Sequence, residues 1–248
     1  MSRTPWLSRS VKDLDALFGI DLKALIEGKV KANQMGSHKV RNISVLEVGY
    51  GKGNLLSELS DHFGQGINLY GINYCGVEKF DYKEEGYAKL FEYDAGEYIR
   101  FGDESLDFVV SQYAFHYIKD KKRTVEEVWR VLKVGGEAYI HFDSSRDFYA
   151  DFLRLPTPRF VIYDKENLVS TKVFFDKLSK AGYGLHLRES FKNKKDTILL
   201  IQKTNRDPLN INLELDEIST IDLRRLRKEV NDGHKWWGYR TVYRILQG

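Results

Sequence analysis

A short stretch between residues 45 and 56 constrains the fold of this chain more than any other feature. The apolar run Val45-Leu46-Glu47-Val48 leads into Gly49-Tyr50-Gly51-Lys52-Gly53, and Asn54-Leu55-Leu56 then begins a helical pattern. Glycine adopts positive φ without strain and has no side chain, so three alternating glycines predict a tight turn that a ligand can approach closely. A helix that starts there exposes unpaired N–H groups, which favours a polar or anionic part of a ligand.

From about residue 41 onward, apolar runs alternate with amphipathic runs. That order predicts an α/β fold, a doubly wound seven-stranded mostly parallel sheet with helices on both faces. The expected strands are Ile43–Val48, Ile67–Ile72, Lys89–Tyr93, Leu106–Ser111, Ala138–Phe142, Leu185–Arg188 and Thr197–Gln202. The expected helices are Asn54–Phe63, Arg123–Leu132, which Gly135-Gly136 should stop, and Leu168–Leu178. Only a polar, Lys-rich stretch separates the last two strands, so they should form a C-terminal antiparallel hairpin.

Three segments can be distinguished along the chain. Residues 1–40 read as a helical N-terminal cap, and residues 41–204 carry the sheet. Within the latter, residues 143–165 form an irregular connection that contains two prolines. Residues 205–248 are a basic, aromatic C-terminal extension. It is expected to begin with a strand-like run, Leu209–Leu215, and to continue as a basic amphipathic helix that includes Leu223, Leu226 and Val230.

Two other ligand classes that use glycine turns fit this chain poorly. The dinucleotide fingerprint wants Gly or Ala at the third helix-packing position, where Asn54 stands. It also wants an acid at the end of the second strand, where Asn73 stands. A P-loop would need a Gly-Lys-Ser/Thr ending, which the turn lacks.

The chain resembles the class I (Rossmann-like) methyltransferases, which use S-adenosylmethionine. Their first motif has the form acid-x-Gly-x-Gly-x-Gly, and the match here is Glu47, Gly49, Gly51 and Gly53. The stretch Trp129–Gly136 resembles the family's helix-to-strand turn, usually written RVLKPGG, with Val134 in place of the proline. The stretch Asp103–Ser111 resembles the family's loop and fourth strand. The resemblance, over residues 41 to about 203, implies an enzyme whose residues 41–204 form an S-adenosylmethionine-binding methyltransferase domain.

The same resemblance implies positions for the cofactor contacts. Glu47 and the loop from Gly49 through Tyr50 and Gly51 to Gly53 would hold the methionine end of S-adenosylmethionine. Asn73 would face the ribose hydroxyls in place of the usual acid, Asp94 with Ala95 would take the adenine, and Gln112 would lie near the sulfonium. Several positions have structural alternatives: helix packing for Gly53, a turn or N-cap for Asp94, a turn for Asn73 and a cover over the loop for Tyr50.

Candidates for the chemistry lie at the carboxyl ends of the strands, where open α/β sheets bind ligands. Methyl transfer from a sulfonium needs a general base only if the acceptor carries a proton of high pKa. Tyr113, His116 and Asp143 are the predicted catalytic residues. His116 lies in a segment similar to the ALHHI-like stretch of small-molecule methyltransferases, and its alternatives are a cap of the next helix or packing beneath the pocket. Tyr113 could be core, Asp143 could cap a turn, and His141, within a strand, is better interpreted as a satisfied core histidine.

The leading hypothesis is methylation of a small molecule at oxygen, nitrogen or carbon. The connection 143–165 is rich in aromatic side chains, which suit a planar or apolar acceptor. They are Phe148, Tyr149, Phe152, Phe160 and Tyr163. The N-terminal cap could supply the opposite wall through Trp6, Leu7, Leu17 and Phe18. The alternative for the aromatic set is a local hydrophobic cluster under a loop.

Two other functions remain as alternatives. The cationic and aromatic residues of the extension could stack bases and bind phosphates, as in an RNA or other nucleic-acid methyltransferase. A basic helix docked on its own domain or on a second subunit gives the same pattern and is favoured. The third hypothesis is a non-catalytic S-adenosylmethionine-binding subunit, for which Asn73 and Val134 are the only indications.

Composition adds a few bounds. A formal net charge of +3 does not by itself argue for nucleic acid. Cys75 is the only cysteine, which precludes an internal disulfide and suits a reducing cytoplasm. The six histidines are far apart and there is no CxxC pair, so no metal site is expected. No apolar run approaches the roughly 20 residues that span a bilayer. The sequence is compatible with a homo-oligomer.

Overall fold

The computed structural model describes residues 9–36, 42–73, 81–143, 160–192, 196–222 and 237–247. Its main sheet has the strand order β3-β4-β2-β1-β5-β6-β10-β9. The bounds of these strands are β1 Ile43–Val48, β2 Ile67–Asn73, β3 Asp81–Glu85, β4 Ala88–Glu92, β5 Leu106–Ser111, β6 Leu132–Asp143, β9 Gly184–Glu189 and β10 Thr197–Gln202. Strands β4, β2, β1, β5 and β6 run parallel to one another. At the two ends of the sheet the pairing is antiparallel, between β3 and β4, between β6 and β10, and between β10 and β9. The predicted doubly wound α/β fold is therefore confirmed, and so is its C-terminal hairpin.

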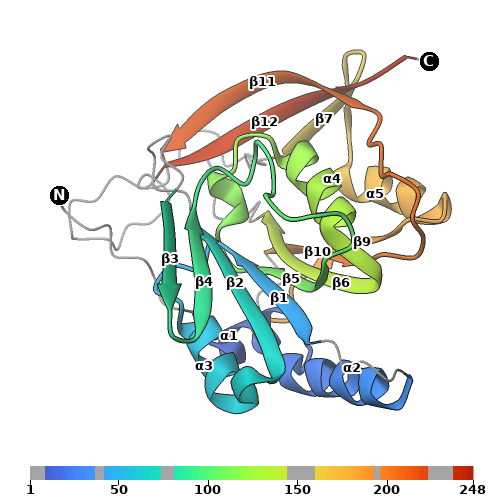
Figure 1. Ribbon diagram of the computed structural model, residues 1–248. Coiled ribbons are helices and arrows are strands. Elements are labelled where there is room, and N and C mark those ends of the chain that lie inside the picture. Colours follow the sequence, from blue (N-terminus) through green and yellow to red (C-terminus); the bar gives the residue numbers. More distant parts are fainter. Residues whose placement is uncertain are drawn as a thin grey trace.

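Helices cover both faces of this sheet (Figure 1). On one face lie α1 (Val11–Phe18), α2 (Leu22–Gly36) and α3 (Asn54–Phe63), and their apolar side chains share one core cluster with β1 and β2. On the other face lie α4 (Lys121–Val131) and α5 (Thr171–Lys180), which pack into a second cluster. Strands β1 and β5 are buried along their whole length, as strands covered on both faces must be.

A second, four-stranded sheet lies beyond α4 (Figure 1). Its order is β11-β12-β7-β8, with bounds Leu213–Asp222, Trp237–Ile245, Phe160–Asp164 and Asn167–Val169. Strands β11 and β12 pair antiparallel, and β12 pairs parallel with β7. The C-terminal extension thus forms one sheet with part of the connection that follows β6.

Local elements of the N-terminal cap follow ordinary helix chemistry. Ser10 caps α1, and Asp13 returns the contact to form a capping box. Gly19 ends the same helix with φ of 66°.

Helix α3 begins at Asn54 and ends before Gly64, as predicted. Short 3₁₀ turns lie at η1, Gly64–Gly66, and η2, Phe115–Tyr117.

Several predicted boundaries are wrong. The third expected strand is shifted by one residue to β4, and its antiparallel neighbour β3 was not expected. Helix α4 is not stopped by glycine, because Leu132 already belongs to β6, which runs on through Gly135-Gly136. There Gly135 N and Lys203 N each donate to a carbonyl of the opposite segment. Backbone pairing that a single sequence does not reveal thus overrides the glycine signal.

Two further predictions fail in the C-terminal half. The helix expected from Leu168 begins only at Thr171, because Ser170 caps it and residues 167–169 pair with β7 as strand β8. The connection 143–165 contains the regular strand β7 and is not irregular throughout. In the extension, strand pairing starts at Leu213 rather than Leu209. The helix expected around residues 223–230 lies outside the described residues.

Candidate functional site

The glycine turn has the predicted tight geometry. Gly49, Gly51 and Gly53 have φ of 82°, 58° and 78°. Gly49 N donates to Ile72 O at 2.6 Å, and Gly53 N donates to Tyr50 O at 2.7 Å. A Cβ on Gly49 would lie 2.1 Å from the Cβ of Ala114, so the turn touches the segment after β5 directly. The N-cap residue Gly53 has no side chain to cap the first turn of α3, so the N–H groups of this turn receive no N-cap hydrogen bond.

Tyr50 and Asn73 hold the turn against β2. The ring of Tyr50 packs on Gly71 of β2, where an added Cβ would stand 2.7 Å from Cδ1 of Tyr50. Gly51 N donates to Asn73 Oδ1 at 3.1 Å, and Asn73 Nδ2 donates back to Gly51 O at 3.2 Å. An amide can make about four hydrogen bonds, and these two are the ones that the side chain of Asn73 makes with described residues.

The loop after β4 continues the same edge of the sheet. Tyr93 N donates to Asn73 O at 2.9 Å, which joins this loop to the end of β2. Asp94 Oδ1 accepts from Gly96 N at 2.8 Å, and partial burial raises the pKa of its carboxyl despite that hydrogen bond. Ala95 is buried and its carbonyl accepts from Thr124 Oγ1 of α4 at 3.5 Å. Asp94 thus forms a turn, which is the structural alternative given for it, at the position where adenine is expected.

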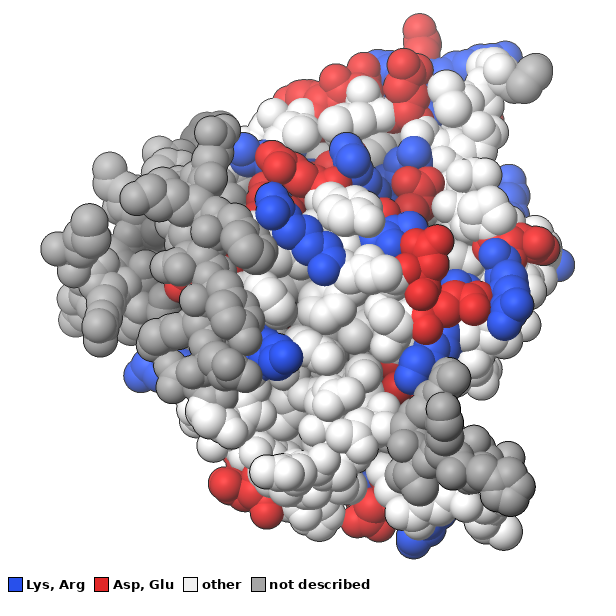
Figure 2. All heavy atoms as spheres, in the orientation of Figure 1, with Lys and Arg blue, Asp and Glu red and all other residues white. Residues whose placement is uncertain are grey.

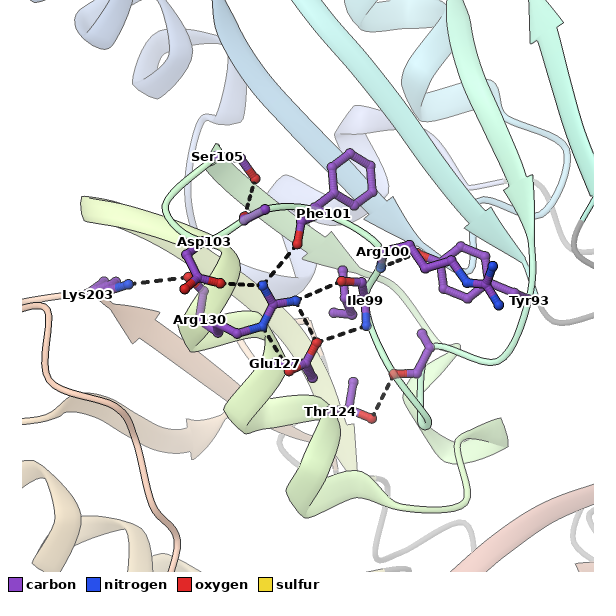
Figure 3. Close-up of polar contacts among 12 residues, drawn as sticks. Tyr93, Ile99, Arg100, Phe101, Asp103, Ser105, Thr124, Glu127, Arg130 and Lys203 are labelled. Atoms are coloured by element: carbon purple, nitrogen blue, oxygen red, sulfur yellow. Dashed lines mark hydrogen bonds and ion pairs between the residues drawn. The ribbon is translucent and has the colours of Figure 1, made fainter.

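Arg130 of α4 fixes the next part of that loop, as Figure 3 shows. Its guanidinium donates to Phe101 O at 2.9 Å and to Ile99 O at 2.8 Å. It also pairs with Asp103 at 2.6 Å and Glu127 at 2.7 Å. Glu127 Oε2 in turn accepts from Ile99 N at 3.0 Å. Sequence reasoning missed this clamp, although the Glu-x-x-Arg spacing on one helix face was a visible signal.

Glu47 is buried within β1, with 2% of its surface exposed. Burial raises the pKa of its carboxyl to about 8, and the Glu58 carboxylate adds to the rise. Oε2 has no hydrogen-bond partner in the described part of the chain. A buried carboxyl oxygen left in this way is costly, and a ligand ammonium group would satisfy it.

The end of β5 faces the N-terminal cap. Gln112 is 3% exposed and its Nε2 donates to Ser10 O at 3.4 Å. Among the described residues, neither Gln112 Oε1 nor the buried Ser111 Oγ has a hydrogen-bond partner. The Arg9 guanidinium lies 4.4 Å from the ring centroid of Tyr113, a cation–π contact. The cap therefore rests directly on the strand end where the sulfonium is expected.

Tyr113 adopts a strained backbone conformation. Its φ is 53°, which side-chain-bearing residues rarely adopt, and it immediately precedes the residue that touches Gly49. Strain of this kind is held in place by its surroundings and often marks a functional site. The ring of Tyr113 also packs edge-on to His141, with centroids 4.3 Å apart.

The contacts of the other two predicted catalytic residues, His116 and Asp143, do not point to a catalytic role. His116 lies in η2, is 8% exposed and stacks on Tyr117 at 4.1 Å between centroids. Asp143 ends β6 opposite Thr197, and its side chain lies outside the description. Of the expected aromatic cover, Phe160 is instead core, packed between Phe142 and Tyr243. Trp6, Leu7, Phe148, Tyr149 and Phe152 fall outside the described residues.

Together, the ends of β4, β2, β1 and β5 stand side by side in that order and carry the predicted cofactor residues. The turn is free of side chains at its glycines, and two buried polar side chains, Glu47 and Gln112, have unused acceptors there. These features fit an amino-acid-bearing nucleoside such as S-adenosylmethionine. No His, Cys, Asp and Glu group suited to a metal ion occurs within the described ranges. None of the helices described combines the length and apolar character needed to cross a membrane.

Comparisons with known proteins give the family. The family model described as "Methyltransferase domain" matches residues 46–140. The chain is 26% identical over 128 residues to the ubiquinone/menaquinone biosynthesis C-methyltransferase UbiE of Geotalea daltonii, a match over 49% of this chain and 49% of that protein. It is 27% identical over 109 residues to a polyketide synthase-nonribosomal peptide synthetase of Aspergillus clavatus, over 40% of this chain and 3% of that protein.

A solved S-adenosylmethionine-dependent methyltransferase from Aquifex aeolicus aligns over 77% of this chain and 94% of its own, at 21% identity and a TM-score of 0.40. The matches to the two curated relatives thus span half or less of those proteins. The glycine turn, the strand order and the matched residues agree on one family. The domain over residues 46–140 belongs to the class I S-adenosylmethionine-dependent methyltransferases.

Proposed function

We propose that the chain transfers the methyl group of S-adenosylmethionine to a small-molecule acceptor. The observation that carries the proposal is the N-terminal cap resting on the end of β5, through Gln112 and Ser10 and through Arg9 and Tyr113. A cap in this position would cover the space beyond the strand end, which suits a small acceptor better than a polymer. The similarity to UbiE, a C-methyltransferase of quinone biosynthesis, supports the same reading.

Different residues at the strand ends would bind different parts of S-adenosylmethionine. Glu47, the glycine turn and Gln112 would hold the methionine end, Asn73 the ribose, and Asp94 with Ala95 the adenine. When bound, S-adenosylmethionine supplies a methyl group on a sulfonium, which is reactive by itself. The chain then has to align the acceptor with that methyl group and exclude water. Tyr113, His116 and Asp143 remain candidates for contact with the acceptor.

Binding of S-adenosylhomocysteine, the product form of the cofactor, tests the proposal first. Calorimetry should show binding to the intact chain, and NAD should not compete. A tritiated methyl group should then pass from S-adenosylmethionine into the small-molecule fraction of a cell extract. Absence of S-adenosylhomocysteine binding, or label found only in RNA, DNA or protein, would contradict the proposal.

The described surface gives little support to a nucleic-acid substrate. On the face in Figure 2, cationic and anionic side chains are interspersed over α4, and acidic side chains gather along β11. The exposed acids of that strand include Glu214, Asp216 and Glu217. Arg244 of β12 pairs with Asp216 at 3.1 Å, so this cation of the extension is already neutralised by its neighbour. Phosphate binding needs cations that gather on one face.

A further inference from the structure

His141 of β6 is buried without the hydrogen bonds that a core histidine normally has. Its exposed fraction is 2%, and in the described part of the chain neither Nδ1 nor Nε2 has a hydrogen-bond partner. Nε2 lies 3.8 Å from Oδ2 of Asp196, which is itself buried. Its burial agrees with the sequence-based interpretation of His141 as a core residue, but the described residues supply no hydrogen bond that would satisfy its ring nitrogens.

The position of His141 brings it to the candidate site. Ile140 stands opposite Ser111 in the β5–β6 pairing, so His141 is level with Gln112 at the carboxyl edge of the sheet. Because side chains alternate along a strand, His141 shares a face with Tyr139, whose ring packs on Phe18 of α1. That is the face covered by the N-terminal cap. The ring contact with Tyr113 joins His141 to the strand end where methyl transfer is proposed.

The chemistry of this pair suits proton transfer. A neutral imidazole has one nitrogen that accepts a proton or hydrogen bond, and a buried acceptor without a partner is ready for a hydroxyl donor. A carboxylate a short distance away stabilises the imidazolium that forms when the proton arrives. Among the described residues, the charged and titratable groups near His141 include Asp196 and Tyr113. Arg9 lies over the Tyr113 ring, and Arg188 of β9 stands in the same row of the sheet, beyond Ile198.

We infer that His141, supported by Asp196, is the general base for an acceptor with an acidic hydroxyl, such as a phenol or an enol. This inference rests on the proposed function and names its substrate class. As the sulfur–methyl bond breaks, the new bond forms from the acceptor oxygen, or from the carbon conjugated to it. The proton of the acceptor passes to His141, and the sulfur leaves as the neutral thioether of S-adenosylhomocysteine.

A binding experiment tests the base without turnover. 4-Nitrophenol absorbs at longer wavelength as the phenolate, so its spectrum reports proton transfer on binding. With saturating S-adenosylhomocysteine, the wild-type protein should bind 4-nitrophenol and raise the phenolate band. His141→Asn should lose that rise while keeping its affinity for S-adenosylhomocysteine. His186→Asn, the same change at an exposed histidine of β9, is the matched control and should behave like wild type.

A kinetic experiment distinguishes a base from a structural residue. Across phenols of increasing acidity, His141→Asn should slow methyl transfer by about 100-fold or more for the least acidic acceptors. The defect should shrink for acidic phenols and at higher pH, because these acceptors ionise without help. Asp196→Asn should show the same trend with a smaller loss. A fold that is merely damaged would lose the same factor for every acceptor and pH.

The outcomes separate this inference from the proposed function. If the wild-type protein does not bind S-adenosylhomocysteine, the proposed function fails first. If it binds and labels the small-molecule fraction, but neither ionises 4-nitrophenol nor methylates any phenol or enol, the function stands and the base is overturned. Full activity of His141→Asn, or a loss that is equal for all phenols, likewise overturns it.

Discussion

Among single residues of the candidate cofactor site, Glu47 has the clearest effect on stability. Its folded-state pKa of about 8 lies above the ordinary value of 4.5. Between those two pH values the folded protein binds a proton that the unfolded chain releases. The free energy of unfolding therefore falls as pH rises through this window, and the carboxyl costs on the order of a few kcal/mol at its upper end.

Glu47→Gln removes this titration. We expect the ligand-free variant to lose less stability than wild type between pH 5 and pH 8, because the amide has no proton to release. Its affinity for S-adenosylhomocysteine should fall, since the carboxylate for the ligand ammonium is gone. Urea unfolding at both pH values and calorimetry measure the two effects. An identical change of stability with pH in both proteins would refute the assignment.

Gly49 is held by contact as well as by conformation. Gly49→Ala combines a φ of 82° with a Cβ placed 2.1 Å from that of Ala114, so the backbone itself must shift. We expect a loss of about 2–4 kcal/mol and weaker S-adenosylhomocysteine binding. Gly64→Ala, at φ 57° and ψ −133° with open space around the added Cβ, carries only the conformational cost of about 1–3 kcal/mol and should leave binding intact. Equal losses for the two variants in urea unfolding would show that the Ala114 contact is unimportant.

At the level of elements, helix α4 orders the loop that leads away from Asp94 and the proposed adenine position. Arg130 donates to two loop carbonyls and pairs with Glu127 and Asp103, and the Glu127 carboxylate raises the pKa of its guanidinium. A guanidinium presents five donors in a rigid fork, and an ammonium cannot reproduce that pattern. The loop geometry therefore depends on arginine in particular at this position.

Arg130→Ala should lower the free energy of unfolding by about 2–3 kcal/mol, and Arg130→Lys should restore only part of the loss. Hydrogen exchange should quicken at the Ile99 amide, which Glu127 binds. Arg123→Ala, at an exposed position of the same helix, is the matched control and should change stability by less than about 0.5 kcal/mol. Unchanged exchange at Ile99 in Arg130→Ala would mean that the loop does not need the clamp.

For the whole molecule, one buried cation joins the two sheets. Lys121 at the start of α4 is 0% exposed, and its Nζ donates to Ile118 O at 2.6 Å, Tyr239 O at 2.9 Å and Thr241 Oγ1 at 3.2 Å. Beside it, the Tyr243 hydroxyl donates to Asp120 Oδ1 at 3.0 Å, and burial raises the pKa of that phenol. These contacts attach β12 to the segment that carries His116.

Lys121→Met keeps the side-chain length but removes the donors, which leaves buried oxygens without that partner. We expect stability to fall by about 2–4 kcal/mol and proteases to cleave the β11–β12 hairpin sooner. Lys122→Met, next in sequence and partly exposed, should resist proteolysis like wild type. A hairpin in Lys121→Met that is as resistant as in wild type would disprove the attachment.

The sequence by itself determined what depends on short-range pattern. Strands β1 and β5, helix α3 and the turn at Gly49–Gly53 were predictable because apolar periodicity and glycine conformation act over a few residues. The resemblance to the family motif then predicted candidate cofactor residues along one sheet edge. Only the tertiary structure decided the pairing of β7 with β12, the strand that continues through Gly135-Gly136, and the amide bridge from Asn73 to Gly51. It also brought His141 against Tyr113 and Asp196. These features join residues far apart in the chain, and which of them meet depends on packing over the whole molecule, which no local pattern encodes.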